Sequence, residues 1–319
     1  MYQDDQQKGK GVYMNRGIDR RTFLKRAGQA GGLIAAGGTI ESLLAACGNA
    51  STTTTASGPT KVPSKGLKKP GLLQWGSDYV DGAPYVFQDP TNPGKLIGFE
   101  VEIAQAMANL MGIKPSQVET DYGHIEAALL ANQFDFIMNG WEITSDRMKT
   151  ELFSDPYYRY GQQIVVRAND PRFSGLDQNS NVQLSALEGL TVGTGTGYKA
   201  ADDLATDPKI NTKLYDGNLP FDDLKQKKID AMMVDLPIIT YYVLGAGPGG
   251  TSDPTLKPIG KPLFPDIYVC GFNRSYPNAQ TVLSEVNQAF AILKKNGTLK
   301  NIYIEWKLWN DQQAAIGIV

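Results

Sequence analysis

The hydrophobic and polar positions divide the chain into an N-terminal part with one weakly apolar stretch and a longer body that begins near Leu72. In the body, short apolar runs alternate with segments of helical periodicity. Residues 72–75 predict a strand, and residues 99–111 predict a helix that ends at Gly112, where a left-handed cap is expected. The same patterns predict helices at 125–131, 198–204, 221–227 and 281–295, and strands at 134–138, 190–193 and 231–234. This alternation predicts an α/β fold with mostly parallel sheets and helices on both faces.

Two segments of the body echo each other. Residues 133–140 and 228–235 each run from a polar residue through an apolar residue and an aspartate into a short apolar strand, and each follows an amphipathic helix. Their strands end at Gly140 and Asp235. Ligands of open α/β sheets bind beyond the carboxyl ends of strands, so two such units predict two lobes that face one cleft. Chance similarity between short apolar strands is the alternative.

The order of the elements predicts the boundaries of the two lobes. We expect lobe 1 to comprise residues 70–160 plus 266–319, and lobe 2 to comprise residues 161–265. The chain then crosses between the lobes twice, near 161–165 and near 262–268. Two crossings form a hinge, and a ligand that bridges both lobes favours closure.

The N-terminal part has the order of a secretory signal: a basic region, an apolar region and small residues. Arg20-Arg21, followed by Phe23-Leu24-Lys25, resembles a twin-arginine export signal. The sequence Leu44-Ala45-Ala46-Cys47 resembles the lipobox of bacterial lipoproteins, whose cysteine is lipidated. We therefore expect residues 1–46 to be a signal peptide and Cys47 to carry a lipid. Residues 47–69 continue in small polar residues that predict a flexible linker.

Composition and charge narrow the function classes. The formal net charge is −2 and no basic block is present, which argues against nucleic-acid binding. His124 is the single histidine, so a His-rich metal site is excluded and a Ser-His-Asp triad would depend on that residue. Cys270, in an apolar run, predicts a buried and inert thiol. A Cys47–Cys270 disulfide is possible but not favoured.

Candidate ligand-binding residues follow the first echo strand. A free amino acid needs a cationic fork or an amide nest for its carboxylate, a carboxylate for its ammonium, and a wall for its side chain. Thr144 is a suitable N-cap for a short helix, and Arg147 stands on the first turn of that helix. Its planar fork can reach back over the strand end. A surface arginine after a capped turn is the alternative.

The second half offers a glycine-rich loop and an acid. Residues 192–198 join a strand to a helix, and Gly193, Gly195 and Gly197 let the backbone approach an anion. The loop is not followed by the Gly-Lys-Ser/Thr of a nucleotide-binding loop, so a small anion such as a carboxylate fits better. Asp235 ends the second echo strand, where it can pair with an ammonium or serve as a helix N-cap.

Taken together and in order, these segments resemble the amino-acid-binding solute-binding proteins of ABC importers, family 3. The resemblance covers roughly residues 72–307. It rests on Gly98–Ile103, Asp135 with Gly140, Ile143-Thr144 with Arg147, Phe153–Tyr157, Leu187-Glu188-Gly189 with Gly195-Thr196-Gly197, Asp230-Ala231 with Asp235, and Asn296-Gly297-Thr298 before Tyr303 and Trp306. It implies the two-lobed periplasmic-binding-protein-like fold, an extracytoplasmic location and ABC permease subunits as partners.

The resemblance also implies roles for individual residues. Arg147 clamps the ligand carboxylate, helped by the amides near Gly140, Thr196 and Gly197, while Asp235 takes the ammonium. The aromatic side chains near Tyr79 and Tyr122 pack on the ligand. The expected ligand-binding residues are Asp78, Tyr79, Tyr122, Gly140, Trp141, Glu142, Thr144, Arg147, Thr196, Gly197 and Asp235. No catalytic residue, metal or cofactor is expected, and the protein is expected to act as a monomer.

Two positions depart from the family pattern. Glu142 stands where the family often has Ser or Thr, so its carboxylate can share the ammonium with Asp235, select a cationic ligand or turn away. The loop 78–85 is one residue longer than usual before its proline, which leaves open whether Asp78 or Tyr79 faces the ligand.

Two other function classes stay open beside a transport protein. A cyclohexadienyl dehydratase-like lyase on the same fold would need an acid/base in the cleft, for which Glu142 or His124 is available. A ligand-sensing module would need a separate signalling partner. His124, just before the helix at 125, is more simply read as an exposed helix-start residue.

Overall fold

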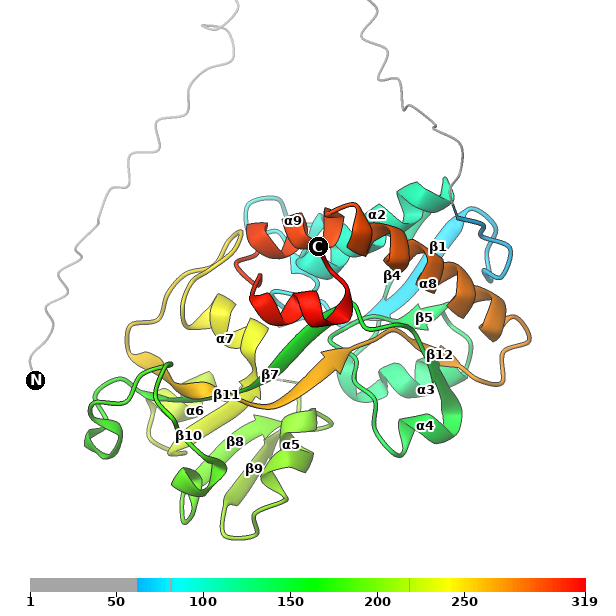
Figure 1. Cartoon of the computed structure of the whole chain (residues 1–319). Coiled ribbons are helices and arrows are strands. Elements are labelled where there is room, and N and C mark those ends of the chain that lie inside the picture. The colour runs from blue at the N-terminus through cyan, green and yellow to red at the C-terminus, as the bar shows by residue number, and fades with distance from the viewer. Residues whose placement is uncertain (1–61, 81, 218) are drawn as a thin grey trace, which may run out of the picture. The chain divides into compact units, whose positions relative to one another are not determined.

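The computed structural model describes residues 62–80, 82–217 and 219–319 (Figure 1). The predicted signal peptide, the lipidation site Cys47 and the linker up to residue 61 lie outside the described residues. Among the described helices, none combines the length and apolar character that crossing a membrane requires.

The first of two five-stranded sheets carries strands from both ends of the described body. Its order is β4-β1-β5-β12-β6. These strands are β1 (Leu72–Ser77), β4 (Lys114–Glu119), β5 (Phe136–Ile137), β6 (Glu151–Phe153) and β12 (Gly271–Asn273). Strand β1 pairs in parallel with β4 and β5, whereas β12 is antiparallel to β5 and β6. Strands β2 (Phe87–Gln88) and β3 (Leu96–Ile97) form a separate two-stranded sheet.

The second five-stranded sheet is built from the middle of the chain, in the order β11-β7-β10-β8-β9. Its strands are β7 (Tyr158–Arg167), β8 (Thr191–Gly195), β9 (Asn211–Tyr215), β10 (Ala231–Asp235) and β11 (Leu256–Tyr268). Strand β8 pairs in parallel with β9 and β10, and β7 is antiparallel to β10 and β11. Each sheet therefore combines a parallel half with an antiparallel half, so the sheets are mixed rather than mostly parallel.

The five helices predicted from apolar periodicity are present, with small shifts at their ends. The longer helices of the structure are α2 (Phe99–Met111), α8 (Ala279–Lys295), α9 (Thr298–Glu305) and α7 (Leu236–Tyr242). The shorter ones are α3 (Ile125–Leu130), α4 (Arg147–Thr150), α5 (Lys199–Leu204), α6 (Phe221–Lys225), η1 (Tyr122–His124), η2 (Pro171–Phe173), η3 (Leu184–Leu187) and η4 (Asp311–Ile316). The five predicted helices are α2, α3, α5, α6 and α8, whereas α7 and α9 were not predicted. In Figure 1, α2 and α8 cover one face of the first sheet and α3 lies on the other.

The sequence echo corresponds to a repeated structural unit. Asp135 donates its N–H to the carbonyl of Gln74 at 3.0 Å and accepts the Gln74 N–H on Oδ2 at 2.9 Å. Asp230 makes the same pair of bonds with Thr191, at 2.8 Å and 2.9 Å. Each aspartate thus fixes the start of its strand to the neighbouring parallel strand. The echo is therefore more than a chance similarity of apolar runs.

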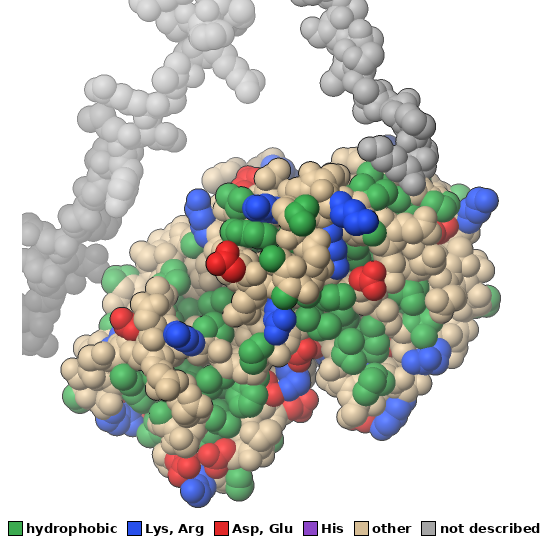
Figure 2. Space-filling view, viewed as in Figure 1, with side chains coloured by type: hydrophobic (Ala, Val, Ile, Leu, Met, Phe, Trp, Pro, Cys, Tyr) green, Lys and Arg blue, Asp and Glu red, His purple; other side chains and the backbone are tan. Residues whose placement is uncertain are grey.

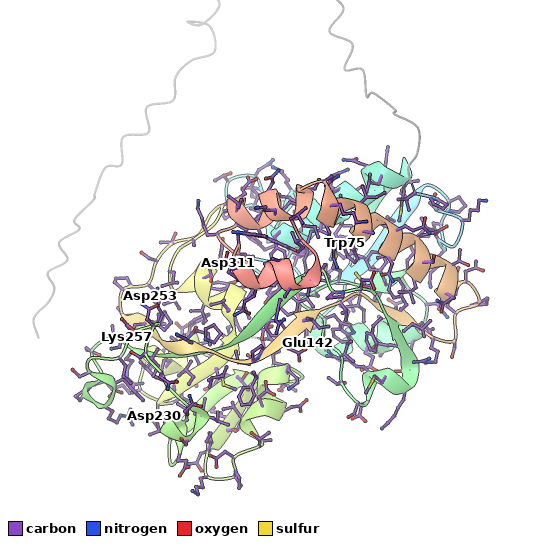
Figure 3. The ribbon with its side chains drawn as sticks, viewed as in Figure 1. Trp75, Glu142, Asp230, Asp253, Lys257 and Asp311 are labelled. Carbon is purple, nitrogen blue, oxygen red and sulfur yellow. The ribbon has the colours of Figure 1, made fainter. Side chains whose placement is uncertain are left out.

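The two sheets are joined where β7 and β11 run antiparallel. Their pairing starts at Tyr158 and Tyr268 and loses its regular register between Ile259 and Asp266. Phe264 has φ +46° and Gly260 has φ +73° in this irregular segment. Figure 3 shows Trp75 within the first half of the body, Asp230 within the second, and Glu142 between them. The lobe boundaries inferred from the sequence stay a prediction, although this irregular segment overlaps the expected crossing at 262–268.

The predicted buried thiol is confirmed. Cys270 lies between β11 and β12 and is completely buried. Its N–H donates to Ser154 Oγ at 2.8 Å, and burial raises the pKa of the thiol well above its usual value. A protonated thiol of this kind is a poor nucleophile.

Candidate functional site

A cavity of about 560 Å³ opens where the two echo strands end. Gly140, just beyond β5, and Asp235, at the end of β10, both line it. The loop after β1 contributes Asp78, and the loop after β8 contributes Thr196. The surface is hollowed between the two halves of the body on the face shown in Figure 2. The prediction that both strand ends face one cleft is thus confirmed.

Acidic side chains dominate the charge of this cavity. The acids among the described lining residues are Asp78, Asp121, Glu142, Asp216 and Asp235. None of these described lining residues is Lys or Arg, and His124 is the one histidine. The His124 side chain is 83% exposed and contacts Asp121 at the mouth. The lining therefore favours a positively charged group over a negative one.

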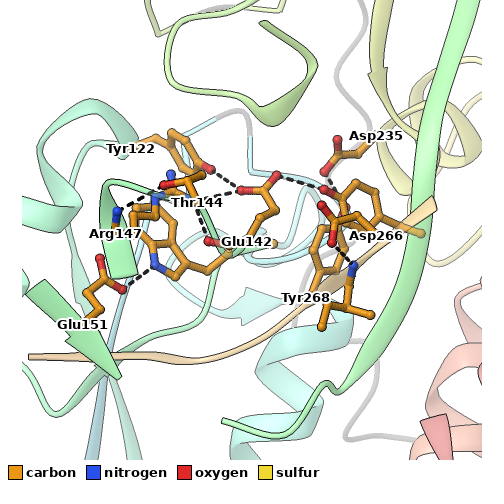
Figure 4. Close-up of polar contacts among 12 residues, drawn as sticks. Tyr122, Glu142, Thr144, Arg147, Glu151, Asp235, Asp266 and Tyr268 are labelled. Atoms are coloured by element: carbon orange, nitrogen blue, oxygen red, sulfur yellow. Dashed lines mark hydrogen bonds and ion pairs between the residues drawn. The ribbon is translucent and has the colours of Figure 1, made fainter. Parts of the chain in front are cut away.

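Asp235 is buried at the floor of the cavity and is held by two donors. Gln162 Nε2 donates to Oδ1 at 2.8 Å, and the hydroxyl of Tyr268 donates to Oδ2 (Figure 4). Burial raises the pKa of Asp235 well above its usual value, and the nearby Glu142 adds to this rise. A cation placed beside Asp235 would favour its charged form and reverse the shift. Asp235 is therefore a suitable partner for a ligand ammonium.

Glu142 and Arg147 form a buried ion pair beside the same cavity. Arg147 Nη1 lies 3.1 Å from Glu142 Oε2 and also donates to the Glu142 carbonyl at 3.0 Å. Both side chains are nearly inaccessible, at 9% for Arg147 and 3% for Glu142. Glu142 lines the cavity, whereas Arg147 does not. In Figure 4 the Glu142 carboxylate lies between Arg147 and Asp235.

The position of Arg147 is fixed by its neighbours in sequence and in space. Its N–H donates to Thr144 Oγ1 at 3.2 Å, the bond expected of a capping threonine, although α4 itself begins at Arg147 with Asp146 at the N-cap position. Its guanidinium carbon lies 3.3 Å from the centroid of the Trp141 ring. Trp141 Nε1 in turn donates to Glu151 Oε2 at 2.8 Å. Thr144 and Trp141 do not line the cavity; they hold Arg147 rather than form the wall.

Tyr122 and Tyr198 form part of the aromatic wall, together with Tyr85 and Tyr215. The Tyr122 ring packs against Trp141 and Tyr198 at centroid distances of 5.7 and 5.3 Å, and both tyrosines line the cavity. Asp78 accepts the Tyr122 N–H at 3.0 Å and also lines it. Tyr79 instead borders a second, separate hollow with Phe87 and Tyr241. Of the two loop residues left open by the sequence, Asp78 therefore faces the main cavity.

The amides expected to clamp an anion are largely engaged within the protein. The Gly140 N–H donates to Glu100 Oε1 at 2.8 Å, and the Thr196 N–H donates to the Tyr215 carbonyl at 2.9 Å. Thr196 lines the cavity and Gly197, with φ +77°, is exposed beside it. In this conformation the amides of Gly140 and Thr196 are not turned toward an anion, which corrects the predicted nest at these two positions.

The model of the bacterial extracellular solute-binding proteins, family 3, matches residues 76–308. The chain belongs to this family. Its two sheets, joined through β7 and β11 with a cavity at the strand ends, are the two lobes of such a solute-binding protein.

Curated relatives of this solute-binding protein carry names of amino-acid-binding proteins. The L-cystine-binding protein TcyJ of Escherichia coli is 29% identical over 232 residues, which cover 70% of this chain and 78% of the relative. The arginine-binding extracellular protein ArtP of Bacillus subtilis is 28% identical over 257 residues, which cover 79% of this chain and 91% of the relative.

Solved structures show the same fold. An ancestral arginine-binding protein bound to glutamine has a TM-score of 0.63 and 27% identity, covering 76% of this chain and 100% of the other. The holo form of ArgBP from T. maritima has a TM-score of 0.59 and 25% identity, covering 73% and 95%. An ancestral amino-acid-binding protein described as a precursor of cyclohexadienyl dehydratase has a TM-score of 0.59 and 27% identity, covering 74% and 95%.

Sequence reasoning missed several residues that shape the site of this solute-binding protein. Tyr268 and Gln162 hold Asp235, and the Tyr160 hydroxyl donates to Glu142 Oε1 at 3.3 Å. In the sequence, Gln162 and Tyr268 fall within the expected crossing segments at 161–165 and 262–268, which as crossings carry no signal of a binding role. Alternate positions of a strand share a face, so Tyr158, Tyr160 and Gln162 on β7 carried a usable signal. No cluster of His, Cys, Asp and Glu placed to hold a metal ion occurs in the described part of the chain.

Proposed function

We propose that the protein captures a free amino acid between its two lobes outside the cytoplasmic membrane and delivers it to the permease of an ABC importer. The observation that carries this proposal is the cavity at the two strand ends, with buried Asp235 on one side and the Arg147–Glu142 pair on the other. Asp235 serves the ligand ammonium. Arg147 serves the ligand carboxylate. The names of the relatives, which include L-cystine-binding and arginine-binding proteins, support a ligand of this class.

The two groups come from different lobes, which gives the ligand a means of closing them. Arg147 begins α4, beside the first sheet, whereas Asp235 ends β10 in the second. A ligand that contacts both binds the closed form more tightly than the open form, and this difference in affinity shifts the equilibrium. We take residues 70–160 plus 266–319 as lobe 1 and residues 161–265 as lobe 2, with the hinge in the irregular pairing of β7 and β11.

A thermal-shift screen of the twenty amino acids against the purified body, residues 62–319, tests the ligand class. A ligand that binds only the folded state stabilises it by about 2.7 kcal/mol at one hundred times its Kd. We expect one or a few amino acids to raise the melting temperature, and isothermal titration calorimetry to give one site per chain. Asp235→Asn should abolish both signals, because Asn cannot balance the ligand ammonium. Absence of binding by all twenty amino acids would reject the proposal.

The proposed location rests on the N-terminal sequence. We propose that the chain is exported by its twin-arginine-like signal, cleaved before Cys47 and held at the outer face of the membrane by a lipid on that cysteine. The polar residues up to 69 then act as a tether of about 20 residues that lets the body reach a permease. Mass spectrometry of the mature N-terminus should find acylated Cys47, and Cys47→Ala should release the protein from membranes. A mature membrane protein that keeps residues 1–46 would contradict this anchoring.

The lyase alternative is favoured by one observation, the raised pKa of buried Glu142 beside the cavity. A protonated carboxyl there can act as a general acid. Against it, Glu142 is held by Arg147 and Tyr160, and the named curated relatives are binding proteins. Incubation with prephenate or arogenate separates the two functions: turnover by the wild type that is lost in Glu142→Gln would support a lyase, and we expect no turnover.

A further inference from the structure

The charges of the cavity do not balance for a neutral amino acid. Such a ligand brings one carboxylate and one ammonium, which Arg147 and Asp235 balance. Glu142 is then left as a buried carboxylate without a counterion, since Arg147 is the one cation within its reach among the described residues. Glu142 then either stays charged at a cost of several kcal/mol or must take up a proton, and a cationic group beside it avoids both. One more positive charge is therefore needed beside Glu142, and the ligand supplies it.

Glu142 also occupies the route from the cavity to Arg147. Glu142 Oε2 lies 3.1 Å from Arg147 Nη1 (Figure 4). The Glu142 side chain lines the cavity, whereas that of Arg147 does not. The hydroxyls of Tyr122, which lines the cavity, and of Tyr160, which does not, lie 3.5 and 3.3 Å from the Glu142 oxygens. A ligand carboxylate thus reaches Arg147 after the Glu142 carboxylate moves off it.

We propose that Glu142 is the specificity-determining residue of this site: it occupies Arg147 in the empty protein, is displaced by the ligand carboxylate, and then pairs with a cationic side chain of the ligand. This rests on the proposed function and names its substrate class, the cationic amino acids. Neutral amino acids of the same shape are rejected because their binding releases Glu142 into the cavity without a partner. The other acids of the lining, Asp78, Asp121 and Asp216, act in the same direction by raising the local concentration of cations.

Three ligands of matched shape test this mechanism by calorimetry with the wild-type full chain. L-Arginine carries the carboxylate and the side-chain cation, L-citrulline replaces the guanidinium by a neutral urea, and agmatine keeps the guanidinium but lacks the carboxylate. We expect arginine to bind at least tenfold more tightly than either of the other two. If citrulline bound as tightly as arginine, the side-chain cation would not contribute to binding. If agmatine bound as tightly as arginine, the carboxylate would not contribute. Either result would overturn the proposal.

The variants Glu142→Gln and Glu142→Thr test whether Glu142 causes the preference for arginine over citrulline. Each should reduce the ratio of arginine to citrulline affinity at least tenfold, through weaker arginine binding, stronger citrulline binding or both. Thr is included because a smaller hydroxyl side chain leaves Arg147 open if Gln packs poorly. The matched control is Glu188→Gln, which removes the same charge from an exposed glutamate that does not line the cavity; its ratio should equal that of the wild type.

The outcomes separate this inference from the function on which it rests. An unchanged arginine-to-citrulline ratio in both Glu142 variants, with intact folding by circular dichroism, overturns the role of Glu142 and leaves amino-acid binding standing. If the wild type binds a neutral or acidic amino acid but not arginine, the role of Glu142 is likewise overturned and amino-acid binding stands. Absence of binding by every amino acid rejects the proposed function as well.

Discussion

The hydroxyl of Tyr268 donates a hydrogen bond to Oδ2 of Asp235, and this bond connects the end of β11 with the end of β10. The same hydroxyl lies 2.8 Å from that of Tyr85, in the loop that follows β1. A chain of hydrogen bonds thus runs from the first lobe to the carboxylate proposed to bind the ligand ammonium. The Asp235 carboxylate is therefore linked by hydrogen bonds to β11 and, through Tyr268, to the loop that follows β1.

Tyr268→Phe should weaken ligand binding without unfolding the protein. The substitution removes one of the two donors described for Asp235, and a hydrogen bond to a charged group contributes about 1.5–3 kcal/mol, which corresponds to roughly a tenfold to hundredfold loss of affinity. Calorimetric titration measures the loss. The control is Tyr303→Phe, which removes a buried hydroxyl that donates to the Tyr157 carbonyl, away from the cavity. Equal affinities in the two variants would contradict the role given to Tyr268.

Arg147→Ala should lower both affinity and stability. Binding is lost because the carboxylate has no counterion. Stability falls by about 3–5 kcal/mol, because Glu142 is left buried without its partner. Urea unfolding of the unliganded protein gives the stability.

The double variant Arg147→Met, Glu142→Gln separates the two effects. It removes both charges, so most of the stability should return while ligand binding stays absent. The test is decided by the urea midpoints: a double variant that is no more stable than Arg147→Ala would show that the ion pair is not the cause of the loss.

The overall fold could be read from the sequence because its signals are local. Apolar periodicity placed α2 at residues 99–111, and the paired Asp135 and Asp230 motifs predicted two related units. The antiparallel half of each sheet could not be read in this way. It depends on pairing between distant segments, such as Gly271 with Phe153, whose order the local pattern does not specify.

The candidate site was predictable in its members but not in its arrangement. The strand-end rule placed Gly140 and Asp235 at one cavity. It did not show that the Gly140 N–H is taken by Glu100, forty residues earlier, or that Arg147 is covered by Glu142. Such pairings depend on side-chain conformation and burial, which residue spacing does not determine.

Glu100 should make the stability depend on pH. Burial raises its pKa from 4.5 to about 7, against the hydrogen bonds from Tyr157 and Gly140. When folding raises the pKa of a carboxyl, its protonated form stabilises the folded state. This contribution is fully present below the pKa of the unfolded state and is lost as the pH rises through the pKa of the folded state. The shift corresponds to about 3 kcal/mol lost between roughly pH 4.5 and 7.

Glu100→Gln tests this dependence. Urea unfolding at pH 5, 6.5 and 8 should show a smaller loss of stability in the variant than in the wild type. Some pH dependence should remain, because the pKa of Glu151 is also raised to about 7 by burial. Glu188→Gln, at an exposed carboxylate, should keep the wild-type slope. Parallel slopes for Glu100→Gln and the wild type would show that Glu100 is ionised in the folded protein at all three pH values.

The paired aspartates of the structural echo offer a last comparison. Both oxygens of Asp135 accept backbone N–H groups, from Lys68 at 2.7 Å and from Gln74 at 2.9 Å. In Asp135→Asn, one of these N–H groups must face the NH₂ of the new side chain, and a buried donor without an acceptor costs about 1–3 kcal/mol. Asp230→Asn should cost less, because its side chain is 31% exposed and water can replace the lost contact with Arg172. Urea unfolding of both variants decides the order; a larger loss for Asp230→Asn would show that the ion pair with Arg172, rather than the shared strand-start hydrogen bonds, stabilises this unit.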